Sequence, residues 1–352
     1  MYRFGNRIDL YPMVYEFSNL YAAYLEVARG KRFQREFQTF DFNLEENLIE
    51  IQNELIWKTY KPGGTVSFYV YEPKERYITR PQIFDRIVHH ALIRVVKPYY
   101  YRIFDKSSYA CQEKKGQLAA CTHLSSLQRS AIGKFGFHFG VTAIDIHHFF
   151  QSIDFATLKV LVGYVFQDDS DIIWLFYQII DAVDEGIPIG FLPSQYNANL
   201  VGTALDYYLA RTPGAGYRCR YMDDLRIYSR DIDSARAILF SIDEFCSSRL
   251  MLTLNLKKSR TWTFAGKDTF CGYVVGPHHL EAKRSTVKRG ERRIHKKIGE
   301  YQAGKLSGEK LYQSAKNLND YLSHTIGKPS NRFADKAILI GREEMKKRRT
   351  AG

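Results

Sequence analysis

Apolar side chains recur at three- and four-residue intervals through most of the first sixty residues, which is the spacing of amphipathic helices. The repeats include Tyr15, Leu20, Tyr24 and Val27, followed by Leu44, Leu48, Ile51 and Leu55. A Pro-Gly-Gly sequence at 62–64 interrupts this pattern, and the β-branched and aromatic residues at 66–71 favour a strand. Helical spacing returns at 84–95 and at 117–132. The first 140 residues are therefore predicted to be mainly helical.

Short apolar runs and longer helical segments alternate in the rest of the chain. Strands are predicted at 141–144, 217–221, 225–229 and 270–275. Helices are predicted at 155–183, 191–210 and 234–249. A Gly- and Pro-containing segment at 186–190 is typical of a turn. The runs at 217–221 and 225–229 are close enough to pair as a β-hairpin.

Three aspartates lie where predicted strands end. Asp223 and Asp224 stand between two strand-forming runs, so we expect them at the bend of the hairpin. Asp145 directly follows the buried strand at 141–144. Mg²⁺ prefers oxygen ligands, and paired ions roughly 3.5–4 Å apart can clamp the attacking and leaving oxygens of a phosphoryl transfer. We therefore predict that the three aspartates are catalytic residues that bind two Mg²⁺ ions.

The composition indicates a globular protein and excludes several classes. The chain has 352 residues and is 45% hydrophobic, which is enough for one large core or two to three subdomains. Its apolar runs are shorter than the roughly 20 residues that span a bilayer, so we expect a cytoplasmic protein with no membrane partner. The five cysteines are scattered, as expected of reduced thiols. The chain lacks the Gly-x4-Gly-Lys-Ser/Thr motif of P-loop ATPases.

Positive charge is concentrated at the C-terminal end. Residues 281–352 contain 19 Lys and Arg against 8 Asp and Glu, so they carry +11 of the net charge of +13. On a helix, six of these side chains would form one cationic stripe because they recur every four residues: Lys288, Arg289, Arg292, Arg293, Lys296 and Lys297. Like charges at this spacing destabilise an isolated helix, which favours a nucleic-acid partner. A solvated basic tail is the alternative.

Five blocks of sequence, in order, resemble the motifs of reverse transcriptases over about residues 29–275. The blocks are Asp145-Ile-x-x-Phe-Phe150, Gly190-x-x-x-Ser194-Gln195, Tyr221-Met-Asp-Asp224, Leu254-Asn-x-x-Lys258 and Phe270-x-Gly-Tyr273. The resemblance implies an α+β fold of the right-hand polymerase type and RNA-directed DNA synthesis. It places fingers at 1–140 with 155–188 inserted, an antiparallel-sheet palm at 141–154 and 189–280, and a basic helical thumb at 281–352.

The resemblance also implies roles for individual residues. Lys258, or its neighbour Lys257, would neutralise charge on the pyrophosphate leaving group, and Phe150 would exclude ribonucleotides as a steric gate. The residues that would contact nucleotide or template are Lys74, Arg76, Ile146, Phe149, Phe150, Ile189, Gly190, Ser194 and Gln195. The primer grip would consist of Phe270, Gly272 and Tyr273, and the cationic stripe would contact nucleic acid. The implied partners are template RNA, a primer or cDNA, and dNTP.

Within reverse transcriptases, three segments resemble the diversity-generating retroelement branch: 85–92, 108–111 and 189–195. Members of that branch copy a template RNA with errors concentrated at adenines and work with a small accessory protein. Ile189 replaces a Gln that would hydrogen-bond near the incoming nucleotide, so we expect looser base selection; ordinary turn packing is the alternative. Arg226 departs from the family because it stands in a strand that is normally apolar. The alternative functions are an antiphage defence reverse transcriptase that copies a noncoding RNA and a non-catalytic, maturase-like RNA-binding protein.

Overall fold

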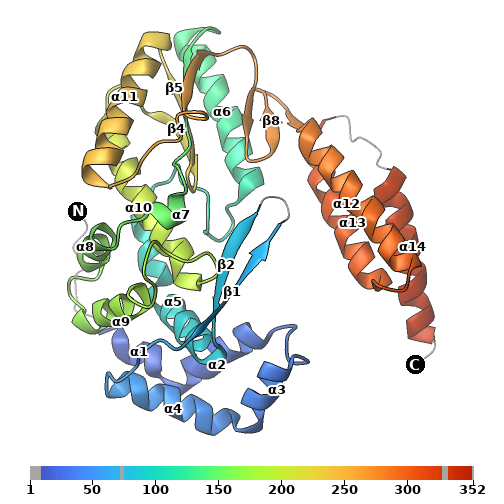
Figure 1. The fold of residues 1–352 in the computed structure, drawn as a ribbon. Coiled ribbons are helices and arrows are strands. Elements are labelled where there is room, and N and C mark those ends of the chain that lie inside the picture. Colours follow the sequence, from blue (N-terminus) through green and yellow to red (C-terminus); the bar gives the residue numbers. More distant parts are fainter. Residues whose placement is uncertain (1–8, 72–74, 327–331, 351–352) are drawn as a thin grey trace.

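The computed structural model describes residues 9–71, 75–326 and 332–350 (Figure 1). The N-terminal part is built from five helices, which are α1 (Tyr11–Tyr15), α2 (Phe17–Ala28), α3 (Arg35–Phe42), α4 (Leu44–Ile56) and α5 (Ile83–Ile103). Their apolar faces form a common core in which Leu20, Leu48 and Leu92 are fully buried. The three- and four-residue periodicity of the sequence is therefore satisfied by packing of helix against helix.

Two further helices belong to the same core. They are α8 (Phe155–Val165) and α9 (Ser170–Ile180), so the prediction of one helical stretch at 155–183 is wrong. Asp169 explains the division, because its carboxylate caps α9 by accepting a hydrogen bond from the Ile172 N–H at 2.9 Å. The other carboxylate oxygen accepts from the Leu10 N–H at 2.8 Å, which fastens the N-terminal segment to α9.

A two-stranded antiparallel hairpin extends from this helical part towards the middle of the molecule (Figure 1). It consists of β1 (Thr65–Val70) and β2 (Arg76–Pro81). The β2 strand is fastened at its centre, since the Thr79 N–H donates to the Ile189 carbonyl at 3.0 Å. The hairpin therefore lies against the 186–190 turn, more than a hundred residues further along the chain.

A four-stranded antiparallel sheet with the order β4-β5-β3-β6 forms the centre of the fold. Its strands are β3 (Gly140–Ile144), β4 (Tyr217–Tyr221), β5 (Asp224–Ser229) and β6 (Arg260–Thr263), and the short helix α7 (Phe149–Ser152) follows β3. Residues alternate between the two faces, so Ile144, Leu225 and Ile227 join the large core while Val141 and Tyr228 join a second core.

Helices cover both faces of the sheet. One face packs against α10 (Leu192–Arg211) and α11 (Ile232–Arg249), and the other packs against α6 (Gln117–Phe135). This contact explains why α6 is apolar along Ala120, Cys121 and Leu124, which are all fully buried. α6 therefore packs on the central sheet and belongs to the second core.

A small three-stranded sheet follows the central one. Its strands are β7 (Asp268–Phe270), β8 (Tyr273–Val275) and β9 (Leu280–Ala282). The prediction of a single strand at 270–275 is wrong, because Cys271 and Gly272 form the bend of a hairpin with φ values of 47° and 86°. Gly272 adopts such a backbone conformation without steric cost, so the Gly at this position marks a turn.

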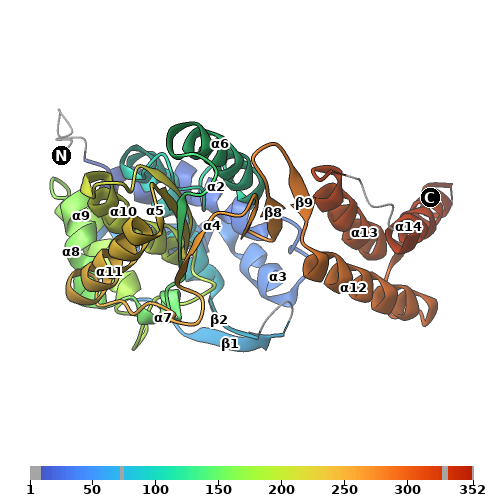
Figure 2. The ribbon, with the colours of Figure 1, turned by 90° about the horizontal axis from the view of Figure 1, so that it is seen from above.

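The C-terminal part is a bundle of three helices, which stands apart from the rest of the molecule in both views (Figures 1 and 2). The helices are α12 (Arg284–Gln302), α13 (Gly308–Ser323) and α14 (Arg332–Thr350). They enclose a separate core that includes Ile294, Leu311 and Leu318. Among the residues that the structure describes, no helix has the length and apolar character to cross a membrane.

One buried ion pair joins the central sheet to α10. Arg220 of β4 donates to both carboxylate oxygens of Asp206, with Nη2 at 2.6 Å from Oδ2, and the two side chains are 2% and 0% exposed. The pair fits because α10 carries Gly202 at the contact: a Cβ added there would come within 2.2 Å of Arg220 Nη1. Since neither charge reaches water, each depends on the other.

We predict that Asp206→Ala lowers the free energy of unfolding by about 3–5 kcal/mol, because the guanidinium of Arg220 then stays buried without its partner. The exposed pair of Arg236 and Asp233 provides a control, and Asp233→Ala should cost at most about 1 kcal/mol. Urea unfolding of the three proteins measures both changes. Equal losses in the two variants would contradict the prediction.

Candidate active site

The structure brings the predicted catalytic aspartates to one end of the central sheet. In the antiparallel register of β3 and β5, Ile144 lies opposite Leu225, so the next positions along the two strands are Asp145 and Asp224. Alternation places both on the sheet face that α6 covers. Asp223 occupies the bend between β4 and β5, next to Met222, whose φ of 58° is unusual for a residue with a side chain. Residues about eighty positions apart in sequence thus meet at one edge.

The segment after α11 orients Asp145. Asp145 accepts a hydrogen bond on its carbonyl oxygen from the Asn255 N–H at 2.8 Å, and its own N–H donates to Ser259 Oγ at 3.1 Å. The turn between these contacts presents Lys258, whose Nζ lies 2.8 and 2.7 Å from the two carboxylate oxygens of Asp145. Of the two lysines that the sequence offered, Lys258 makes this ion pair.

The charge of Asp224 is offset on the same face by Arg226, two residues along β5. Arg226 Nη1 donates to Asp224 Oδ1 at 2.5 Å. Burial nevertheless raises the pKa of Asp224 to about 6, because the gain from Arg226 does not outweigh lost hydration and the nearby negative charges of Asp223 and Asp145. Negative charge is therefore crowded at this edge, which is a setting that a divalent cation relieves.

The donor atoms fit a hard divalent cation such as Mg²⁺, because all three side chains are carboxylates. In this structure both carboxylate oxygens of Asp145 contact Lys258, and Oδ1 of Asp224 contacts Arg226. Within the described residues, no three His, Cys, Asp or Glu side chains surround one point as metal ligands would. Binding of an ion would therefore require these carboxylates to exchange a contact with a basic side chain for one with the metal.

The aromatic residues after β3 lie beside this edge on α7. Phe149 is 4% exposed and belongs to the large core, together with Ile146, which is also 4% exposed. Phe150 is only partly buried, and its carbonyl oxygen accepts from the Ile187 N–H at 2.9 Å. Of these three predicted substrate contacts, Phe150 is therefore the most accessible, while Ile146 and Phe149 mainly hold α7 to the core.

The predicted nucleotide-binding turn lies where the β1–β2 hairpin meets the start of α10. Ile189 accepts a hydrogen bond from β2 through its carbonyl oxygen, and Gly190 has a φ of 129°. A Cβ at Gly190 would lie 2.3 Å from the backbone oxygen of Thr79, so only Gly permits this close approach. On α10, Ser194 is 4% exposed, whereas Gln195 is exposed and its Oε1 lies 3.5 Å from the Sγ of Cys111.

The cations that were expected to contact the triphosphate begin the second strand of the hairpin. Arg76 is exposed at the start of β2, opposite Val70. Lys74 lies outside the described residues. In Figure 1 the free end of the hairpin points towards the gap between the sheet and the C-terminal bundle.

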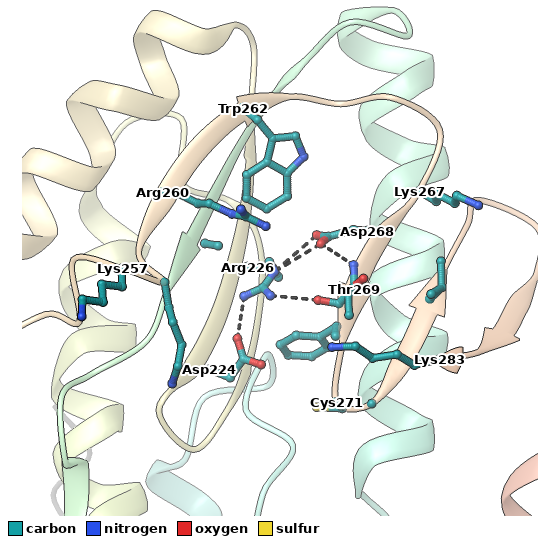
Figure 3. Close-up of a pocket in the computed structure, with 15 residues that line it drawn as sticks. Asp224, Arg226, Lys257, Arg260, Trp262, Lys267, Asp268, Thr269, Cys271 and Lys283 are labelled. Atoms are coloured by element: carbon teal, nitrogen blue, oxygen red, sulfur yellow. Dashed lines mark hydrogen bonds and ion pairs between the residues drawn. The ribbon is translucent and has the colours of Figure 1, made fainter. Parts of the chain in front are cut away.

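Two residues of the predicted primer grip, Phe270 and Gly272, line a cavity that also borders Asp224 (Figure 3). The cavity measures about 650 Å³ and lies between the central sheet and the β7–β8 hairpin. Phe270 and Tyr273 are buried and pair with each other next to the bend of that hairpin, and Gly272 lies in the bend. The cavity is strongly basic, since its lining includes Arg226, Lys257, Lys258, Arg260, Lys267 and Lys283.

The basic stripe lies on α12, where its six Lys and Arg side chains face away from the bundle core. Five of them are exposed and Lys297 is half-buried. The opposite side of α12 is buried at Gly290, Ile294 and Ile298. Beyond the predicted residues, Tyr321 of α13 joins the bundle to the β7–β8 hairpin, since its hydroxyl donates to the Gly272 carbonyl at 2.7 Å. Asp268 was also not predicted from the sequence. Both Tyr321 and Asp268 lie outside the five motifs, and no sequence pattern distinguished either residue.

No protein-family model and no curated protein sequence matches the chain. Solved structures, however, show the fold: it is the α+β, right-hand polymerase fold that the sequence predicts, shared with telomerase. Apo telomerase from Candida tropicalis matches with a TM-score of 0.54 and 12% identity, over 86% of this chain and 62% of that one. Telomerase from the same organism in complex with a TWJ fragment of telomeric RNA matches with a TM-score of 0.54 and 12% identity, over 86% of this chain and 57% of that one. This chain thus spans about three fifths of the length of those telomerases.

We predict that Gly190→Ala destabilises the protein by more than about 1 kcal/mol, because the backbone is strained at positive φ and the new methyl group collides with β2. Gly133 is a matched control, since it lies in α6 with no atom within 4 Å of an added Cβ. Gly133→Ala should be stabilising by about 0.5–1 kcal/mol. Thermal unfolding measures both, and a neutral Gly190→Ala would show that the turn can separate from β2.

Proposed function

We propose that this protein is an RNA-directed DNA polymerase. The observation that carries the proposal is the meeting of Asp145 with the Asp223–Asp224 pair at one edge of an antiparallel sheet, beside a large basic cavity. The polymerase fold and the order of the five sequence blocks support it. We further propose that residues 141–154 and 189–280 act as the palm, 1–140 with 155–188 as the fingers, and 281–352 as the thumb.

In this proposal Asp145, Asp223 and Asp224 hold two Mg²⁺ ions. When bound, such ions lower the pKa of the primer 3′-hydroxyl and neutralise charge on the triphosphate. Lys258 would neutralise charge on the leaving pyrophosphate, which is supported by its contact with Asp145 and by a side chain that is more than half exposed. Phe150 would lie beneath the sugar as the steric gate, and Arg76 would contact the triphosphate.

The nucleic-acid partners follow from the distribution of charge. The α12 stripe would lie against the backbone of the template RNA and its primer or cDNA, because exposed Lys and Arg interact with phosphates whatever the base sequence. The C. tropicalis telomerase with its bound RNA fragment supports an RNA partner. A small accessory protein would be a further partner in the retroelement role described next.

Within this activity we propose mutagenic copying in a diversity-generating retroelement. Support comes from the segments at 85–92, 108–111 and 189–195, and from the apolar side chain of Ile189 beside the turn that meets β2. The second candidate is an antiphage defence enzyme that makes DNA from a noncoding RNA, because such enzymes share the palm. A non-catalytic RNA-binding protein is opposed by the retained trio of aspartates.

We predict that the parent protein extends a DNA primer on an RNA template in the presence of Mg²⁺, and that Asp145→Asn, Asp223→Asn and Asp224→Asn each lower the rate at least about 100-fold. Each substitution preserves shape and removes a negative charge. Asp168→Asn, in an exposed loop, is the matched control and should retain the parent rate. Full activity of Asp223→Asn would refute the catalytic assignment. A parent that binds RNA without extending a primer would favour the non-catalytic alternative.

We also predict that Ile189→Gln lowers misincorporation opposite template adenine by about twofold to tenfold, which is the range that one hydrogen bond of about 0.5–1.5 kcal/mol supplies. Single-nucleotide incorporation on RNA templates that differ at one position measures the error frequency. Ile49→Gln on α4, where the side chain is 41% exposed, controls for the change in residue type. Equal errors by the parent and Ile189→Gln would show that Ile189 only packs the turn.

A further inference from the structure

Arg226 occupies the centre of the contact between the β4–β5 hairpin, which carries Asp223 and Asp224, and the β7–β8 hairpin (Figure 3). It lies on the same sheet face as Asp224 and Tyr228, because these residues alternate with the buried Leu225 and Ile227 along β5. The side chain is only 12% exposed. A charged group in such a place is costly unless it is paired and hydrogen-bonded, so its contacts require an explanation.

The guanidinium of Arg226 connects Asp224 to the β7 strand. On one side, Nη1 donates to Asp224 Oδ1 at 2.5 Å. On the other side, Nη2 donates to the Thr269 carbonyl at 2.9 Å, and Nε lies 3.4 Å from the carboxylate of Asp268. The guanidinium carbon also lies 5.3 Å from the centre of the Phe270 ring, within cation–π range. One planar group thus touches a catalytic carboxylate and all three residues of β7.

Further buried contacts hold Asp268 and the β7–β8 hairpin in place. Asp268 is 3% exposed at its side chain and accepts from the Thr269 N–H at 2.6 Å. The Tyr228 hydroxyl lies 3.4 Å from Asp268 Oδ2, and Gln128 of α6 donates to both Tyr228 and the Val275 carbonyl, at 3.0 and 3.1 Å. Because α6 packs on both sheets, the β7–β8 hairpin cannot shift without disturbing several buried contacts.

We propose that Arg226 is a positioning residue that sets the distance and angle between Asp224 and the β7–β8 hairpin, and so aligns a primer end with the catalytic carboxylates. This inference rests on the proposed polymerase function. The bond to Asp224 uses one carboxylate oxygen, Oδ1, so it orients the carboxylate and leaves Oδ2 for another ligand. The arrangement acts like a rigid spacer, since the guanidinium is planar and its donors point in fixed directions.

The spacer connects two parts of the chain that are more than forty residues apart and belong to different sheets. The opposite end of the β7–β8 hairpin is fixed by the hydroxyl of Tyr321, so the primer grip is held between Arg226 and the C-terminal bundle. A lysine at 226 would preserve the charge, but its single ammonium group lacks the fork that reaches both sides at once. We therefore expect Arg226→Lys to disturb the alignment of the primer end with Asp224 even if the protein still folds.

The test compares Arg226→Lys with the parent in three measurements. They are kcat and KM for extension of a primer on an RNA template, the affinity for that primer–template by fluorescence anisotropy without divalent metal, and the fluorescence of 2-aminopurine at the primer 3′ end. We expect a kcat about 10–100-fold lower, which is the effect of a misplacement near 1 Å. The affinity should change less than twofold, and the 2-aminopurine signal should report a less constrained primer end.

Two further variants control the test. Arg230→Lys makes the same exchange directly after the end of the same strand, where the side chain is 78% exposed and paired with Asp231, and it should behave as the parent does. Asp268→Asn keeps the size and the hydrogen-bonding oxygen but weakens the hold on Arg226, so it should reproduce part of the loss in kcat. Its melting temperature and that of Arg226→Lys establish whether each variant is folded.

An Arg226→Lys protein that is folded and has the kcat and the 2-aminopurine signal of the parent would overturn the inference while leaving the polymerase function intact. A loss confined to primer–template affinity, with kcat unchanged, would also overturn it, because Arg226 would then only bind nucleic acid. A parent that extends no primer would instead overturn the proposed function, and the inference with it.

Discussion

The antiparallel register between β3 and β5 is the constraint on which the site depends. Once Ile144 lies opposite Leu225, Asp145 and Asp224 must follow at neighbouring positions and on the same face. A shift by one residue would turn every side chain of a strand to the other face and bury a carboxylate beneath α10 and α11. The register is fixed by two different cores, one on each side of the sheet, so the hydrophobic packing that stabilises the fold also assembles the acids.

Positive charge serves two separate purposes in this molecule. Near the sheet, Lys258, Arg226 and Arg220 each pair with a carboxylate, and the fold encloses Arg220 almost completely. On α12, by contrast, the Lys and Arg side chains face solvent and are available to a polyanion. The net charge of +13 therefore includes two sets of cations with different roles. One set pairs with carboxylates near the sheet, and the other is exposed on α12.

Periodicity and turn residues were sufficient for most of the elements. The amphipathic N-terminal helices, the hairpin that bears Asp223 and Asp224, and the helix that carries the basic stripe all form as expected. The errors arose where a single residue divides a continuous pattern. Asp169 caps the start of α9 after α8 has ended at Val165, and Gly272 reverses an apolar run that otherwise has the pattern of one strand. Local propensity does not distinguish such positions, because the partners that favour the break lie elsewhere in the chain.

The sequence by itself determined the candidate acids and the location of the basic helix, because each is encoded in the spacing or identity of neighbouring residues, and its resemblance to reverse-transcriptase motifs indicated the class of fold. Only the tertiary structure decided that Lys258 rather than Lys257 faces Asp145, that α6 covers the sheet, and that Arg226 joins Asp224 to Asp268. These are contacts between residues that are distant along the chain, and they depend on strand register and on which face of a helix is buried. The presence of Arg226 in an otherwise apolar strand is explained by its contacts with Asp224, Asp268 and Thr269, which only the folded chain brings together.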